Sequence, residues 1–346
     1  MARTATATGE RTPRLDAGVP LWRRGLRYVR SGTGNLFRVM RANPLTLLGF
    51  LMVLVIVVTA LLVVVLPPIT TLLFGKPWSI ALYGTDITPD AGVGPSLAHP
   101  FGTDTIGRDI FSRVLLALPL DLAIGFSIAG FAALAGGGLG LVAGFWDAPG
   151  TIGGAVSLVI MRVTDIFLAF PSLVLALAIA ASLGRGTGSS ILAVMLTWWP
   201  FYVRLTRGEV LAIKHLPYVV AARASGVSNV QILFRHILRN LIEPLIVYFT
   251  MDIGTIIVTF STISFIGIGV PSGVPEWGSM VQNYQKLLLS LPWTVLFPGA
   301  AIFVTVLAFS LLGDGLRDIL DPRSRRVLTQ GVAATARAAT SATTGG

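Results

Sequence analysis

The sequence has no cysteine and only three histidines among its 346 residues. Without cysteine there are no disulfides, no thiolate nucleophile and no zinc–cysteine site, and three histidines argue against a histidine-rich metal centre. Charge is also scarce, because 12% of the residues are charged, whereas soluble domains have about 25%. Since 53% of the residues are hydrophobic, the composition predicts a polytopic membrane protein rather than a soluble enzyme.

The motifs of several enzyme and transporter classes are missing too. The sequence has no G-x-x-x-x-G-K-S/T nucleotide-binding loop, so this chain is not expected to hydrolyse ATP. It has neither the H-E-x-x-H nor the G-x-S-x-G motif, and we expect no catalytic residue, no metal and no cofactor bound by this chain. A secondary transporter would show inverted repeats and coupling-ion sites at the midplane of the membrane. Neither is found, and this class is a less favoured alternative.

Hydrophobic runs predict an all-α fold with six transmembrane helices. The first run, residues 45–66, is 22 residues long and has no charge, and a helix needs about 20 residues to cross the hydrocarbon core. A cleaved signal peptide is the alternative for this run, but its apolar region would be about 7–15 residues long. Pro67 and Pro68 are expected to end this helix. The other runs cover residues 120–146, 155–183, 190–203, 241–270 and 293–312.

The distribution of charge predicts the orientation of these helices. Nine arginines stand before the first run, against Glu10 and Asp16, whereas Lys76 is the only basic residue of 67–100. The positive-inside rule therefore places the N-terminus in the cytoplasm, and six crossings return the C-terminus there. The net charge of +10 is then explained by topology, without a nucleic-acid partner. The predicted segments are a basic cytoplasmic extension (1–42), a first transmembrane helix (43–67), an extracytoplasmic loop (68–115), a core with five transmembrane helices (116–322) and a disordered cytoplasmic tail (323–346).

The second hydrophobic run carries a cluster of glycines at positions 136, 137, 138, 140 and 144. Small residues of this kind let helix backbones approach closely. Close helix packing is therefore the simpler explanation of the cluster, and a flexible gating helix is the alternative.

The predicted cytoplasmic loop 204–240 has the pattern of a helix pair. Pro217 suits the first turn of a short helix, and Gly226 suits the left-handed residue that ends it. Ser228 with Gln231 forms a capping-box pattern that opens a second helix. In that helix the apolar residues at 230, 233, 234, 237 and 238 fall on one stripe. The pair is consistent with a DNA-binding helix–turn–helix, with a structural surface element or with a docking site for a cytoplasmic protein.

The segment 218–247, YVVAARASGVSNVQILFRHILRNLIEPLIV, resembles the coupling-loop signature of ATP-binding cassette (ABC) importer permeases. In that signature Glu-Ala-Ala is followed by three residues and a glycine, and Ala221, Ala222 and Gly226 match it. Val220 stands in the place of the glutamate, and Arg239 stands where a proline is usual. The resemblance implies that the loop seats in a groove of an ATPase subunit and transmits its closure. The implied coupling residues are Tyr218, Val219, Ala221, Ala222, Arg223, Gly226, Ser228 and His236.

Other blocks resemble the C-type permease subunits of dipeptide, oligopeptide and nickel importers. They lie at residues 99–113, 162–171, 263–269, 275–278, 292–293 and 313–322. The resemblance implies a multi-pass protein of the inner membrane, built as a type I ABC importer permease with a coupling helix pair. The implied partners are a second homologous permease, two ABC ATPases that carry ATP and Mg²⁺, and an extracytoplasmic binding protein. The implied substrate is a di- or oligopeptide, with a nickel chelate or another small solute as the alternative.

Charged residues outside the coupling loop leave two kinds of role open. In the loop before the second run, Asp104, Asp109, Arg108 and Arg113 are expected to form a structural charge network, or to contact the binding protein that the resemblance implies. Trp277 leaves a similar choice between such a contact and an aromatic anchor at the membrane interface.

Ionisable residues within the runs are expected to face other helices or a water-filled cavity, because lipid does not solvate charge. Arg162 and Asp165 are three residues apart on one helix face and are predicted to pair with each other or to line the translocation path. Asp252 is a candidate for the path or for the contact with a second permease. A hydrogen bond to another helix of this chain is the alternative for Asp252.

Overall fold

The computed structural model describes residues 44–74, 86–271 and 273–320. These residues form helices and loops, with two isolated antiparallel bridges, Ile87 to Arg108 and Thr103 to Asp109. The predicted extension 1–42 and the predicted tail 323–346 lie outside the described residues. The helices are α2 (Pro44–Phe74), α3 (Ile110–Phe131), π-helical η1 (Ala132–Gly136), α4 (Gly137–Phe145), α5 (Ile152–Leu168), α6 (Ser172–Leu183), α7 (Thr187–Ile213), α8 (Pro217–Ala224), α9 (Asn229–Gln231), π-helical η2 (Ile232–Ile237), α10 (Leu238–Phe265), α11 (Trp277–Tyr284), the 3₁₀ turn η3 (Gln285–Leu287) and α12 (Trp293–Leu320).

Helix α2 continues beyond the predicted end of the first transmembrane helix. It runs through Pro67 and Pro68 and ends at Phe74, so the boundary at 67 was wrong. Proline is tolerated within apolar helices where other groups satisfy the backbone. The hydroxyl oxygens of Thr70 and Thr71 donate to the carbonyl oxygens of Leu66 and Pro67 at 2.9 and 2.7 Å, which adds hydrogen bonds to the turn that contains the prolines.

Helices α3, η1 and α4 form one continuous stretch, Ile110–Phe145, of 36 residues. The stretch begins ten residues before the predicted run, within the segment that we predicted as loop 68–115. The Asp109 carboxylate fixes this start, because its Oδ2 accepts a hydrogen bond from the Ser112 N–H at 2.7 Å, as an N-cap residue does.

The third predicted run is bent rather than straight. Helices α5 and α6 meet at an angle of 87° across residues 169–171. Pro171 has φ −58° and ψ 123°, an extended conformation, and proline cannot supply the N–H that would continue the helix. The predicted run 155–183 is thus two helices with a sharp bend at Pro171.

Helix α7 is longer than the predicted run 190–203. It has 27 residues and continues to Ile213, so about ten residues of the predicted loop 204–240 are helical. Its second half carries Arg204, Arg207 and Glu209. These charges interrupt the hydrophobic run, and for that reason this half was predicted as loop. Beyond α8, helices α9, η2 and α10 form a second continuous stretch, Asn229–Phe265, so the predicted second loop helix is the beginning of a transmembrane-length helix.

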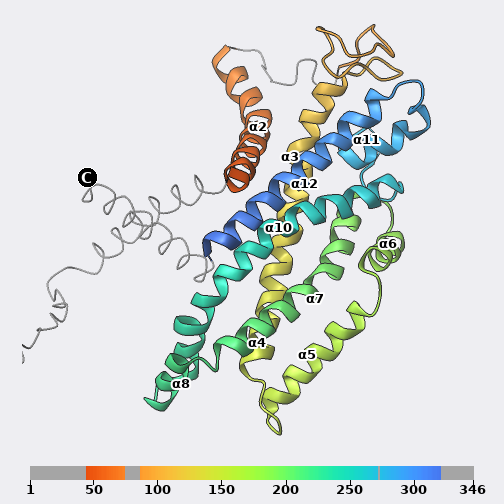
Figure 1. Cartoon of the computed structure of the whole chain (residues 1–346). Helices are drawn as coiled ribbons and strands as arrows, with labels where there is room; N and C mark the ends of the chain where they lie inside the picture. The colour runs from red at the N-terminus through yellow and green to blue at the C-terminus, as the bar shows by residue number, and fades with distance from the viewer. Residues whose placement is uncertain (1–43, 75–85, 272, 321–346) are drawn as a thin grey trace, which may run out of the picture. The chain divides into compact units, whose positions relative to one another are not determined.

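Within the described residues, four helical stretches are long and apolar enough to cross a membrane, and the bent pair makes a fifth if it is one span. The four stretches are Pro44–Leu72, Ile110–Phe145, Asn229–Phe265 and Trp293–Leu320. The protein is thus an all-α membrane protein. Figure 1 shows α10 and α12 running beside each other, with α4 next to α7 and α5 beyond α7.

The main core lies where α3, α10 and α12 meet. It contains Ile124 and Ile128 of α3, Ile256 and Phe260 of α10, and Phe309 of α12, all buried. Most of α2 is covered less, and many of its large apolar side chains are exposed, as expected for a helix that faces lipid.

The glycine cluster lies in a close contact between two helices. Gly136 and Gly140 face α7, and a Cβ atom would lie 2.3 Å from the Trp199 carbonyl oxygen at the first position and 2.6 Å from the Val203 carbonyl oxygen at the second. Such distances are far below van der Waals contact. The structure therefore shows close packing of α4 on α7 at these glycines.

Candidate functional site

We define the α8 tip as residues 214–240, the connection that joins α7 to α10. Pro217 is the first residue of α8, after Leu216 in an extended conformation, and proline is favoured there because the first N–H of a helix needs no partner within the helix. Gly226 has φ +78°, and the Val227 N–H donates to the Ala222 carbonyl oxygen at 3.1 Å. These features close a helix C-terminus, as predicted.

The second half of the α8 tip begins as predicted but buries a different face. The Ser228 hydroxyl oxygen accepts a hydrogen bond from the Gln231 N–H at 3.3 Å. Residues 232–237 then form a π-helical turn, which has more residues per turn than an α-helix and rotates the side chains. Ile232 and Ile237 are buried, whereas Val230 and Phe234 are 62% and 61% exposed. Of the predicted apolar stripe, Leu233 and Ile237 are buried and Leu238 is half-buried, whereas Val230 and Phe234 are exposed.

Three of the implied coupling residues hold the α8 tip together. Val219 is buried against Ile232 and Ile237 in a small apolar core beside the end of α7. The Tyr218 hydroxyl oxygen accepts a hydrogen bond from Asn240 Nδ2 at 3.0 Å, and the Tyr218 and His236 rings lie 6.2 Å apart. These contacts fasten α8 to the beginning of α10.

The remaining implied coupling residues lie on the surface of the α8 tip. Ala221, Arg223, Gly226 and Ser228 are exposed, and Ala222 is half-buried. The tip thus presents small residues and an arginine on a short helix that is fixed from beneath.

The base of the α8 tip is tied to the end of α4. Lys214 Nζ donates to the carbonyl oxygens of Gly144 and Asp147 at 3.1 and 3.3 Å, and Arg207 pairs with Asp147 at 2.8 Å. Burial lowers the pKa of Lys214, and the nearby Arg223 and Arg207 lower it further, against the opposite effect of Asp147. Positive charge at the last carbonyl groups of a helix is favourable, so Lys214 serves the fold.

A second polar cluster joins the 86–109 loop to α11. Arg108 Nε and Asp104 Oδ2 are 2.6 Å apart, so the predicted pair is present. The Tyr284 hydroxyl donates to Asp104 Oδ2 at 2.6 Å and accepts from Arg108 at 2.8 Å. Burial opposes the charge of Asp104, but the hydrogen bonds from Tyr284 and Arg108 outweigh it, and the pKa of Asp104 lies below its usual value. Burial and Asp104 raise the pKa of Tyr284 to about 12.

The other half of the predicted charge network was wrong. Asp109 pairs with His99 Nδ1 at 2.9 Å, not with Arg113, because its carboxylate lies at the N-cap of α3. Asp104 and Asp109 are 0% and 1% exposed, and Trp277 is 2% exposed. These three side chains are turned into the fold, and Arg108, with a side chain 22% exposed, is the most accessible member of the set. Contact of these residues with a binding protein stays a prediction.

Trp277 lies inside the protein rather than at a membrane interface. Its ring nitrogen donates to the Val114 carbonyl oxygen at 3.1 Å, and its backbone N–H donates to Asp121 Oδ2 at 3.2 Å. The preceding residue, Glu276, caps α11 by accepting hydrogen bonds from the N–H groups of Gly278 and Ser279 at 2.8 and 2.7 Å. Burial raises the pKa of Glu276.

The Tyr284 contact makes a testable prediction for the stability of this loop. Tyr284→Phe should lower the free energy of unfolding by about 1 kcal/mol, because it removes a hydrogen bond to a buried carboxylate. The pKa of Asp104 is lowered in the fold, so its stabilising effect is complete above its unfolded pKa and is lost as the pH falls through the folded pKa. In scans of Tm against pH, the acid-side decrease that Asp104 contributes should be smaller in the variant and should end at higher pH, because its folded pKa moves toward the unfolded value. Tyr248→Phe, on an exposed tyrosine of α10, is the control, and equal curves for all three proteins would contradict the prediction.

Comparison with known proteins identifies the family. The family described as "Binding-protein-dependent transport system inner membrane component" matches residues 136–326, which include α4 to α12 and the α8 tip. The chain belongs to this permease family.

Curated relatives cover two thirds of this permease. It is 41% identical over 67% of its length to the dipeptide transport system permease protein DppC of Alkalihalophilus pseudofirmus, covering 74% of that protein. It is 44% identical over 66% of its length to the probable D,D-dipeptide transport system permease protein DdpC of Escherichia coli, covering 75% of it. It is 42% identical over 66% of its length to the glutathione transport system permease protein GsiD of Pectobacterium atrosepticum, covering 74% of it. The predicted resemblance to the dipeptide and oligopeptide branch of ABC importer permeases is confirmed.

A structural comparison gives a more distant likeness. The permease is similar to a chain from the inward-facing MetNI methionine ABC transporter, with a TM-score of 0.48 and 18% identity, covering 61% of this chain and 96% of that chain.

Two carboxylates inside the permease have partners on other helices. Trp198 Nε1 of α7 donates to Asp252 Oδ2 of α10 at 3.2 Å, so the interhelical hydrogen bond that was the alternative for Asp252 is present. Asp165 of α5 pairs with Arg204 of α7 at 2.7 Å. The predicted pair between Arg162 and Asp165 was wrong, because Asp165 pairs with Arg204 and Arg162 is exposed. Among the described residues, no group of three or more His, Asp or Glu side chains is arranged to hold a metal ion.

Proposed function

We propose that this permease forms, with a second related permease, the translocation path of an ATP-driven importer for di- or oligopeptides. Its relatives at 41–44% identity are named as dipeptide and glutathione permeases, which favours a peptide over a nickel chelate or another small solute. Two ATPase subunits supply the energy from ATP and Mg²⁺, and an extracytoplasmic binding protein delivers the substrate.

The proposed arrangement in the membrane has six spans with both termini in the cytoplasm. The spans are α2, the α3–α4 stretch, the bent α5–α6 pair, the apolar first part of α7, the α9–α10 stretch and α12. With this arrangement the α8 tip is cytoplasmic and the 86–109 loop is extracytoplasmic. The excess of arginine before α2 supports this orientation.

The observation that supports coupling best is the α8 tip itself. It joins two long helices, its exposed surface carries Ala221 and Gly226 of the family signature, and Val219 and Tyr218 fix it to α10. ATPase closure would displace the tip and tilt the helices joined to it, so that a cavity between the two permeases opens to one side and then to the other.

Transport by the purified complex tests this proposal. The permease is coexpressed with a second permease, an ATPase and a binding protein of the same transport family from the same organism, and the complex is purified and reconstituted into vesicles. We expect uptake of a labelled dipeptide that requires ATP, Mg²⁺ and the binding protein, and that continues when a protonophore removes the proton gradient. Uptake driven by the proton gradient without ATP would overturn the proposal, and uptake of nickel chelate but not peptide would correct the substrate class.

A further inference from the structure

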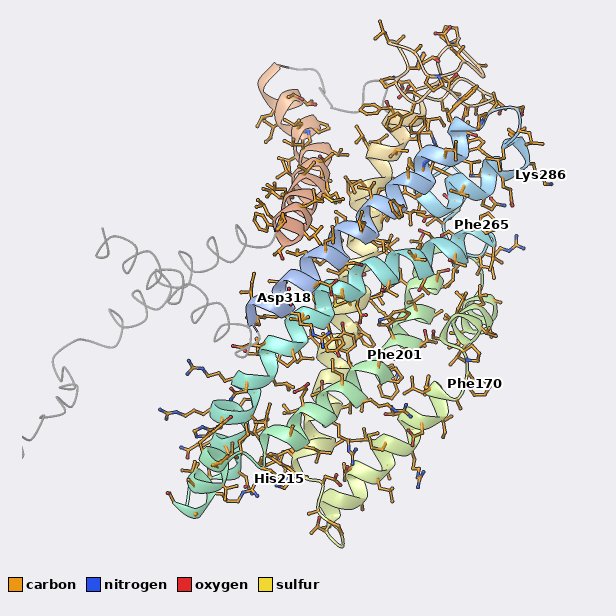
Figure 2. All side chains as sticks on the ribbon, in the orientation of Figure 1. Phe170, Phe201, His215, Phe265, Lys286 and Asp318 are labelled. Carbon is orange, nitrogen blue, oxygen red and sulfur yellow. The ribbon has the colours of Figure 1, made fainter. Side chains whose placement is uncertain are left out.

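The α8 tip has an unusual charge pattern. Residues 214–240 contain no aspartate and no glutamate, but they contain Lys214, Arg223, Arg235 and Arg239. Lys214 is occupied by the carbonyl oxygens at the end of α4. The three arginines are exposed, and none of them makes an ion pair with a residue that the structure describes. Figure 2 shows nitrogen-ended side chains projecting outward from α10 near α8.

Apolar side chains are exposed on the same tip. Val220, Val230 and Phe234 are 53%, 62% and 61% exposed, although Val219, Ile232 and Ile237 nearby form a buried core. Val220 stands where the family signature has a glutamate. A partner surface that faces this position therefore meets a methyl group and not a carboxylate.

The exposed tip extends beyond the thickness of a bilayer core. The stretch Asn229–Phe265 has 37 residues, which at 1.5 Å per residue is about 55 Å, whereas the hydrocarbon core is about 30 Å thick. In the proposed orientation, the end of this stretch that leaves the core is the cytoplasmic one, which carries Phe234, Arg235 and Arg239. A soluble protein partner would cover the exposed apolar side chains at this end.

From this pattern we propose the chemistry of the partner surface: the ATPase groove that receives the α8 tip is apolar at its centre, where it meets Val220, Val230 and Phe234, and carries carboxylates at its rim that pair with Arg223, Arg235 and Arg239. This inference rests on the proposed function and adds to it the charge by which this permease selects its own ATPase. Opposite charges across an interface raise the association rate and exclude wrong partners.

Carbodiimide cross-linking tests the position of the carboxylates. The reagent joins a lysine amine to a carboxylate that lies beside it, and lysine occurs in this permease only at positions 76, 214 and 286, so the background is low. In the purified complex, Arg235→Lys and Arg239→Lys should each give a covalent adduct of the permease with the ATPase, mapped by mass spectrometry to the new lysine. Arg185→Lys, at an exposed arginine before the other end of α7, is the matched control and should give no adduct that maps to residue 185.

Charge reversal tests the contribution of the pairs to binding. The triple variant Arg223→Glu, Arg235→Glu, Arg239→Glu should weaken association with the ATPase at least about tenfold, because like charges then face each other. The triple lysine variant should bind within about threefold of wild type, since exposed ion pairs depend mainly on charge. Binding is measured with the detergent-purified permease and ATPase at low and high salt.

The outcomes separate this inference from the proposed function. Suppose that an ATPase copurifies with wild type, that no adduct forms at 235 or 239, and that the glutamate variant binds as wild type does. The proposal of an acidic rim would then be overturned, and the proposed function would stand. Suppose instead that the glutamate variant loses binding to vesicles of anionic lipid while its binding to the ATPase is unchanged. That result would assign the arginines to lipid headgroups and would also overturn the inference. If no ATPase copurifies with wild type, the proposed function itself fails.

Discussion

Gly140→Val is expected to prevent the permease from accumulating as a folded protein. A Cβ atom at this position would lie 2.6 Å from the Val203 carbonyl oxygen and 2.7 Å from the Thr206 Cβ atom of α7. Neither backbone nor Cβ atoms yield as the end of a flexible side chain does, so the two helices must separate. Overpacking of a close contact costs about 3 kcal/mol, and small residues at such contacts are a main source of helix association in membranes.

The measurement is the yield of monodisperse protein in mild detergent, together with Tm. Gly138→Val is the matched control, because Gly138 lies on the same helix with nothing within 4 Å of its Cβ position. It carries the same change in helix propensity and apolar volume without the clash. Equal yield and Tm for the two variants would show that α4 and α7 are not packed as closely as the structure has them.

Gly226→Asp is expected to leave the permease inserted and folded but to reduce ATP-driven uptake at least about tenfold. Gly226 is exposed, and nothing lies within 4 Å of its Cβ position, so the side chain itself meets no obstacle. The variant adds a carboxylate to a tip that has none. If the ATPase rim is acidic, this charge repels it, and like charges across an interface are strongly unfavourable.

Gly226→Asn separates charge from backbone strain. The residue has φ +78°, and asparagine and aspartate are the non-glycine residues that tolerate this region best. Both variants therefore carry similar strain, and only one carries charge. We expect the asparagine variant to retain most of its uptake, measured in the reconstituted complex with equal amounts of permease. Normal uptake by the aspartate variant would count against docking at Gly226.

Local signals in the sequence predicted the α8 tip well. Pro217, Gly226 and Ser228 act through their own backbone and that of the next few residues, so their effect does not depend on the rest of the fold. Helix ends were harder to predict where a charged or proline-containing segment remains helical. Helix α2 continues through Pro67 and Pro68. The arginine-bearing half of α7 is also helical, because a helix that leaves the membrane can carry charge.

Contacts between distant segments could not be predicted from one sequence. Arg108 and Tyr284 are 176 residues apart and hydrogen-bond directly. Nothing in the sequence around Arg108 indicates which aromatic residue it contacts. Asp109 was expected to pair with an arginine, but the N-cap geometry of α3 turns it toward His99. The π-helical turn at 232–237 could not be predicted from the sequence either. A single extra residue in a turn changes which face of the helix is buried, but it leaves the amino-acid composition unchanged.

The helical stretch from Asn229 to Phe265 is continuous, and in the proposed mechanism it would act as a lever. No loop separates the α8 tip from the part that lies among α3, α7 and α12, so a push at one end would be passed along the helix. For a rod of about 55 Å, one degree of tilt about its midpoint moves each end by about 0.5 Å. A displacement of a few ångströms at the tip is therefore a tilt of several degrees, with the π-helical turn and Pro244 as the two places where the rod bends most easily.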